Sequence, residues 1–176
     1  MKSKSVWILL IVAAILLAGS FFLPYASVDK ETRKSLNQYP DQMYMAEIEM
    51  TNRQSADLAL VEFFKMYSYI SGNMSGNAKD IATLCVALMG VMAGITVLIL
   101  LFALTKKPIP IVILSILNIG IAYLFSWDLK DRGVIDGAPY SFSVAYYLIF
   151  ILLALLAVGS IVAKVLKKKE KVSIPA

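Results

Sequence analysis

The sequence contains no histidine and a single cysteine, Cys85, among its 176 residues. Without histidine the chain lacks the commonest metal ligand and the side chain that best serves acid–base catalysis near neutral pH. One cysteine excludes an internal disulfide and any metal site built from several thiolates, and this one lies in an apolar run, where thiols are unreactive. We therefore expect no enzyme, no cofactor and no metal site.

Charge is also scarce, since 16% of the residues are charged and 59% are hydrophobic, with a mean hydropathy of +0.74. Ordinary soluble domains contain about a quarter charged residues. Four runs without Asp, Glu, Lys or Arg cover residues 6–24, 81–105, 109–127 and 143–163. Each run is close to the roughly 20 apolar residues that cross a bilayer.

Because lipid cannot satisfy free backbone groups, each of these runs should form a helix. Buried helices of a soluble bundle would carry a polar stripe at helical period, whereas these runs are apolar all round. The predicted fold class is therefore an all-α integral membrane protein with four transmembrane helices, arranged as two hairpins of like orientation. An extracytoplasmic insertion, partly helical, separates the first two helices.

The first run also resembles a signal peptide, because Lys2 and Lys4 precede it. Leu17-Ala18-Gly19-Ser20 is similar to a lipoprotein box, but Ser20 stands where that box has its essential cysteine. The run is longer than the usual signal core, and Ala26-Ser27-Val28 is a poor cleavage site. We favour an uncleaved first helix.

Basic residues are unevenly divided between the two ends of the predicted spans. The termini (1–5 and 164–176) and the turn 106–108 carry nine basic residues and one acidic residue, whereas segments 25–80 and 128–142 carry eight basic and eleven acidic ones. Short loops rich in Lys and Arg stay in the cytoplasm. Both termini should be cytoplasmic and the protein should lie in the cell membrane. The basic tail should contact anionic lipid headgroups rather than nucleic acid.

An amphipathic helix is expected over about residues 55–70, with Ser55 as its N-cap. Its apolar stripe follows helical spacing and consists of Leu60, Phe63, Phe64, Tyr67 and Ile70. The stripe packs on the rest of the insertion, lies at the headgroup boundary or receives a partner. Internal packing is the simplest of the three, and we retain these residues as a candidate partner surface. Residues 43–50 fit a strand or a short helix equally.

The second extracytoplasmic segment, 128–142, holds Asp128, Asp131 and Asp136 beside two basic residues. Its spacing is not that of a calcium-binding loop. We expect a solvated turn.

Small residues within the spans indicate where helices approach closely, because apolar side chains gain little by leaving lipid for one another. The candidates are spaced four apart along three of the runs: Ala14 and Ala18, Gly90 and Gly94, Gly159 and Ala163.

Ser115 and Asn118 are the candidate polar contacts inside the membrane. An amide near the bilayer centre should bond to a neighbouring helix, at a gain of about 1 kcal/mol, or else contact a solute in a cavity. The four runs hold no carboxylate that could relay protons, which argues against ion-coupled transport as the function.

The predicted function is that of a non-catalytic membrane protein acting through contacts, as an accessory subunit, a scaffold or an envelope sensor. Its Tyr- and Met-rich outer segment is typical of binding surfaces, so the expected partners are the lipid bilayer and another membrane protein or a second copy. A small channel or carrier subunit is the alternative, and an intramembrane enzyme is the least supported.

The plan of four spans with a large first outer loop resembles the claudin-type layout. The resemblance is one of topology, because the loop lacks the paired cysteines and the Trp/Gly-Leu-Trp signature of that family. It implies no homology and no site residues.

Overall fold

The computed structural model describes residues 3–137 and 139–172. It is 76% helical, and four helices are long and apolar enough to cross a membrane. They are α1 (Ser3–Gly19), α5 (Asn77–Leu104), α6 (Pro108–Asp131) and α7 (Val144–Val172). The prediction of a mostly helical chain with four membrane-length helices is confirmed.

The helix ends differ from the predicted spans for local reasons. The first helix continues only into a 3₁₀ turn, η1 (Ser20–Phe22), and Pro24, which the predicted span included, begins a strand instead. Helix α6 starts at Pro108, in the first turn, where the missing proline N–H would have no helical partner in any case. Helix α7 continues beyond residue 163 because lysine is a good helix former.

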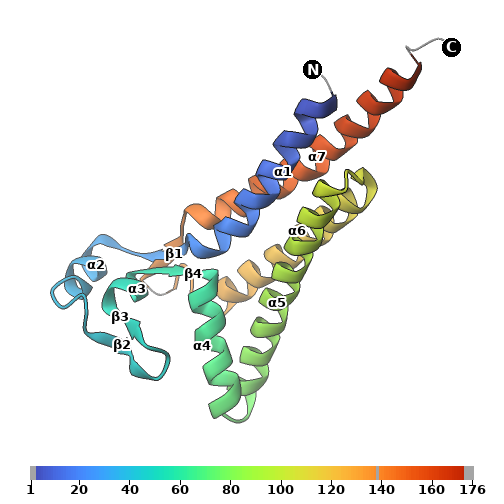
Figure 1. Cartoon of the computed structure of the whole chain (residues 1–176). Helices are drawn as coiled ribbons and strands as arrows, with labels where there is room; N and C mark the ends of the chain where they lie inside the picture. The colour runs from blue at the N-terminus through green and yellow to red at the C-terminus, as the bar shows by residue number, and fades with distance from the viewer. Residues whose placement is uncertain (1–2, 138, 173–176) are drawn as a thin grey trace.

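The four long helices form a bundle in which α1 and α7 lie side by side and α5 and α6 form a hairpin (Figure 1). Both described ends of the chain lie at the same end of this bundle. Its core is made of fully buried aliphatic and aromatic side chains that include Leu10, Leu17, Ile99, Phe125 and Leu156.

Small residues pack closely at the contact between α1 and α7. A Cβ on Gly159 would lie 2.9 Å from Leu10 Cδ2, and Ala14 and Ala163 are fully buried. Gly90 and Gly94 behave differently, because both are exposed and a Cβ on either would meet open space. The two glycines therefore mark no close helix contact within this chain, and a contact with another chain stays a prediction.

The remaining elements cluster at the end of the bundle opposite the described termini (Figure 1). We call this cluster, residues 24–73, 132–137 and 139–143, the polar end. In chain order its elements are β1 (Pro24–Val28), α2 (Lys30–Leu36), β2 (Met43–Met45), η2 (Ala46–Ile48), β3 (Met50–Thr51), α3 (Asn52–Ala56), β4 (Asp57–Ala59), α4 (Leu60–Asn73) and β5 (Tyr140–Phe142).

A three-stranded antiparallel sheet, ordered β4-β1-β5, joins the two connections of the polar end. Strand β1 follows the first apolar helix directly, and Ser27 pairs with Ser141 of β5 and with Asp57 of β4. A second sheet contains only β2 and β3. The three-stranded sheet cannot be predicted from the sequence, since β4 and β5 are too short to show a period.

The amphipathic helix begins at Leu60 rather than Ser55, because β4 occupies the intervening residues. Ser55 is therefore not its N-cap; its Oγ donates to the Asn52 carbonyl within α3. At the true start of α4, the Ala59 N–H donates to Glu62 Oε2 at 3.0 Å.

The apolar stripe of α4 is mostly covered by the chain itself. Leu60, Phe63 and Tyr67 are buried, Ile70 is partly buried, and Phe64 is 42% exposed. This matches internal packing, the simplest of the three alternatives. Within this chain α5 and β4 contact α4, so Phe64 is the one residue of the stripe that is exposed.

We predict that Gly159→Leu destabilises the bundle by about 2 kcal/mol, because the new side chain must displace the buried Leu10. Gly94→Leu is the matched control, since it adds the same side chain to an open helix face. The measurement is thermal unfolding of both purified variants in one detergent. Equal stability of the two variants would contradict the packing described for α1 and α7.

Candidate functional site

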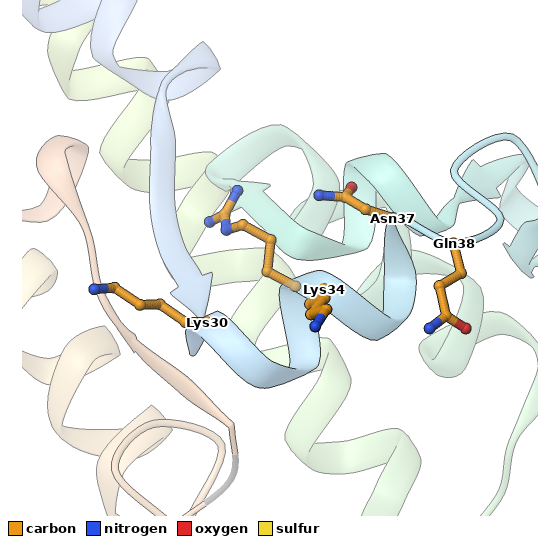
Figure 2. A pocket seen from close by; sticks show the side chains of 5 residues that line it. Lys30, Lys34, Asn37 and Gln38 are labelled. Carbon is orange, nitrogen blue, oxygen red and sulfur yellow. The ribbon is translucent and has the colours of Figure 1, made fainter.

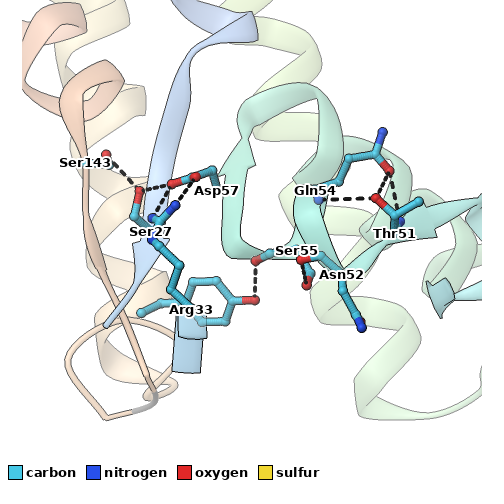
Figure 3. A network of polar contacts seen from close by, with 9 residues as sticks. Ser27, Arg33, Thr51, Asn52, Gln54, Ser55, Asp57 and Ser143 are labelled. Carbon is cyan, nitrogen blue, oxygen red and sulfur yellow. Dashed lines mark hydrogen bonds and ion pairs between the residues drawn. The ribbon is translucent and has the colours of Figure 1, made fainter. Parts of the chain in front are cut away.

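A network of charged and hydroxyl groups ties the two connections of the polar end together (Figure 3). The Arg33 guanidinium of α2 donates to both carboxylate oxygens of Asp57 on β4, at 2.5 and 2.7 Å. Ser27 Oγ of β1 donates to Asp57 Oδ1 at 2.6 Å and lies 3.0 Å from Ser143 Oγ, just before α7. The Asp57 carboxylate on β4 thus bonds to both α2 and β1, and Ser27 links this network to the start of α7.

The geometry around Asp57 stabilises its charged form. Hydrogen bonds from Arg33 lower the pKa of Asp57, and the bond from Ser27 adds to this effect against partial burial, which raises it. A bidentate arginine–carboxylate pair is the stronger kind of ion pair because both groups are planar and matched in spacing. The pair is about one-third exposed on each side, so solvent weakens it.

A buried tyrosine, Tyr25 of β1, lies at the centre of an aromatic cluster beneath this network. Its ring contacts those of Phe63, Phe125, Phe142 and Tyr146, with centroids 5.8 to 6.2 Å apart. These rings come from α4, α6, β5 and α7, so Tyr25 joins the polar end to the bundle. Burial raises the pKa of Tyr25, and its hydroxyl has no hydrogen-bond partner among the described residues.

A second polar cluster lies where α4, α5 and α6 meet. Arg132 forms an ion pair with Asp128 one turn earlier and donates to the Tyr67 hydroxyl at 3.1 Å and to Cys85 Sγ at 3.3 Å. Cys85 Sγ lies 3.4 Å from Asp128 Oδ2. The arginine also lies over the Tyr67 ring, 5.4 Å from its centroid.

This second cluster fixes the helices in place rather than presenting a reactive thiol. Cys85 is fully buried, and its two polar neighbours, Arg132 and Asp128, are paired with each other. In the sequence Cys85 is one residue of an apolar run, and Asp128 belongs to the segment expected to be a solvated turn. Their contact cannot be predicted because the two residues lie far apart along the chain. Within residues 3–137 and 139–172, no group of three or more His, Cys, Asp or Glu side chains could hold a metal ion.

The candidate polar contact inside the bundle joins α5 and α6. Asn118 Nδ2 donates to Thr96 Oγ1 at 3.2 Å and lies 3.4 Å from the Met92 carbonyl oxygen. Ser115 is also buried, and its hydroxyl has no partner among the described residues. The amide nitrogen of Asn118 therefore bonds to α5, whereas its Oδ1 atom has no partner among the described residues. The bond between helices favours a structural role over a contact with a solute.

The segment from Tyr39 to Tyr44 exposes large side chains in the polar end. Tyr39, Met43 and Tyr44 are 66%, 53% and 52% exposed. Met43 and Tyr44 lie on opposite faces of β2 and are both exposed, whereas Met45, the last residue of the strand, is partly buried against the core. Strand β2 pairs only with the two-residue strand β3.

The exposed face of α2 is basic and borders an open pocket. Figure 2 shows Lys30 and Lys34 beside Asn37 and Gln38, around a pocket of about 340 Å³. Arg33 also lines it, although its guanidinium is held by Asp57. The pocket is widely open, so these lysines are solvated charges.

Comparison with known proteins finds no family model, no curated protein and no solved structure that matches this chain. Its function therefore has to be argued from its own geometry.

We predict that acid weakens the polar end through Asp57. Because its pKa is lowered in the folded protein, its contribution to stability is present above the unfolded value, about 3.9. That contribution is lost as the pH falls through the lower folded pKa. Thermal unfolding in detergent, measured from about pH 7 down to about pH 3, should show a smaller acid-induced loss for Asp57→Asn than for the parent.

Asp41→Asn is the matched control for this prediction. Its carboxylate is 88% exposed and lies 4.0 Å from Arg53, so removing its charge should leave the acid dependence unchanged. If Asp41→Asn and Asp57→Asn had identical pH profiles, the role assigned to the Arg33–Asp57 pair would be refuted.

Proposed function

We propose that this chain is a multi-pass protein of the cell membrane, with both termini in the cytoplasm, that acts by contacting another membrane protein or a second copy through its extracytoplasmic polar end. The orientation is supported by the nine basic residues against one acidic residue at the cytoplasmic termini and turn. Accessory subunit, scaffold and envelope sensor all fit this mode of action.

The single observation that carries the proposal is the exposure of three large side chains in one short segment, Tyr39, Met43 and Tyr44. Met43 and Tyr44 leave apolar surface in water on opposite sides of β2, and covering such surface with a partner is favourable. Tyrosine and methionine are also enriched in protein interfaces relative to the rest of the surface. The site of contact we propose is therefore the segment 39–44, in place of the apolar stripe of α4.

The polar end suits a binding role because it is joined firmly to the bundle. Strand β1 pairs with strands from both connections, and Tyr25 contacts rings from α6 and α7. A partner that covers β2 would therefore meet a surface with a fixed position above the membrane. This arrangement favours contact between proteins over transport, because the Asn118 amide inside the bundle bonds to α5.

The proposal predicts a specific photo-cross-link from Tyr44. A photoreactive phenylalanine analogue placed at residue 44, in cells that naturally make the protein, should give one discrete cross-linked membrane protein on illumination. Met43→Asp in the same chain should reduce its yield severalfold, because it places a charge in the proposed contact.

The same analogue at Lys34, on the basic face of α2, is the control and should not give that product. Lipid adducts alone at residue 44, or the same product from both positions, would contradict the proposed contact. The mass of the product distinguishes a different protein from a second copy of this chain.

A further inference from the structure

An apolar groove runs along the outside of the bundle between the end of α1, α4 and α5. It consists of two adjoining hollows of about 370 and 250 Å³, which share Phe21, Val61 and Ala93. The first hollow extends to Lys65 and Gly90, and the second extends along α5 to Val97.

Two of the residues on the α5 side of the groove, Gly90 and Ala93, are small. Gly90 has no side chain, and a Cβ at this position would meet open space. Ala93, one turn further, adds only a methyl group. The exposure of Gly90 is thus explained by the groove, which stays open because this residue has no side chain.

The position of the groove along α5 places it at the edge of the hydrocarbon layer. Helix α5 has 28 residues, which gives a length of about 42 Å, more than the roughly 30 Å thickness of that layer. Counting back about 20 residues from Leu104 puts the boundary near Cys85. The groove therefore starts just inside the boundary, at Met89 and Gly90, and deepens into the membrane toward Val97.

A lysine lies at the outer end of this groove. The lining surface is apolar, so Lys65 contributes its methylene stem while its ammonium group reaches outward. Among the residues that the structure describes, no carboxylate lies within 4.0 Å of that ammonium. The nearby Glu62 accepts a hydrogen bond from the Ala59 N–H.

We propose that this groove binds an acyl chain of an anionic phospholipid, whose phosphate contacts Lys65. The apolar lining matches the acyl chain, and a lysine at headgroup depth attracts an anionic headgroup. A second copy docked symmetrically on the same face would bring its own Lys65 toward the first, which disfavours that occupant. The inference rests on the membrane placement in the proposed function, and it is independent of the contact at residues 39–44.

The test is native mass spectrometry of the full chain in a non-ionic detergent, titrated with phosphatidylglycerol or with phosphatidylcholine of the same acyl chains. The parent protein should bind phosphatidylglycerol about fivefold more tightly than phosphatidylcholine, because one lysine at headgroup depth provides a preference of that size. Lys65→Gln should remove the preference and leave phosphatidylcholine binding unchanged. Lys34→Gln, on α2, is the control for charge.

Filling the groove should weaken both lipids together. Gly90→Leu, with Gly90→Phe as a bulkier second variant, should lower the affinity about tenfold, because at least two methylenes of the acyl chain lose their contacts. Gly120→Leu is the matched control, because Gly120 is an exposed helical glycine on α6 with open space around it. Thermal unfolding of each variant verifies that it is folded.

Three results would overturn the proposal. They are a parent protein that does not distinguish the two lipids, a Gly90 variant that binds lipid as well as the Gly120 variant, and a dimer mass that disappears in the Gly90 variants while lipid binding persists. The last result would assign the groove to a second copy. None of these results bears on the cross-link from Tyr44, so the two proposals fail separately.

Discussion

The pairing of β1 with strands from both connections is the interaction on which the arrangement of the polar end depends. Strand β1 follows the first apolar helix with only a 3₁₀ turn and Leu23 between them, so its position is set by the bundle. Its neighbours β4 and β5 come from segments separated by two long helices. Once β1 is paired on both sides, Asp57 meets Arg33 and Ser27, and Tyr25 meets the rings of α6 and α7.

The second constraint is the apolar outer surface of the bundle. Side chains such as Ile8, Ile113 and Ile151 are each at least 60% exposed on three different helices, and soluble monomers rarely expose apolar surface on this scale. The same surface is favourable in lipid, where the polar groups must instead be satisfied internally. The amide nitrogen of Asn118 is satisfied in this way, because it donates to Thr96 Oγ1 between α5 and α6.

The four long helices could be predicted from the sequence because a membrane span is a local property. Twenty uncharged apolar residues indicate a helix whatever lies elsewhere in the chain. The start of α4 could not be predicted, since the helical period of the stripe is compatible with Ser55 as a cap, and only the pairing of Asp57 and Leu58 with β1 ends the preceding turn.

The polar contacts could not be predicted either, because the residues that form them lie far apart in the sequence. Cys85 and Asp128 are separated by more than a whole span, so neither residue's neighbours in the sequence reveal the contact that Arg132 completes. The small-residue pattern was equally ambiguous. Gly159 lies against α1, whereas Gly90 and Gly94 have the same spacing pattern and face outward.

The most direct test of the account is a disulfide between β1 and β5. Ser27 and Ser141 are register partners, and directly opposed strand residues have Cβ atoms about 4.5 to 5.5 Å apart. In a Cys85→Ser background, Ser27→Cys with Ser141→Cys should form an intramolecular disulfide under mild oxidation, identified by a linked peptide pair. Ser27→Cys with Ser75→Cys, in the turn between α4 and α5, should not. Failure of the first pair to link in folded protein, or equal linking of both pairs, would contradict the joined sheet.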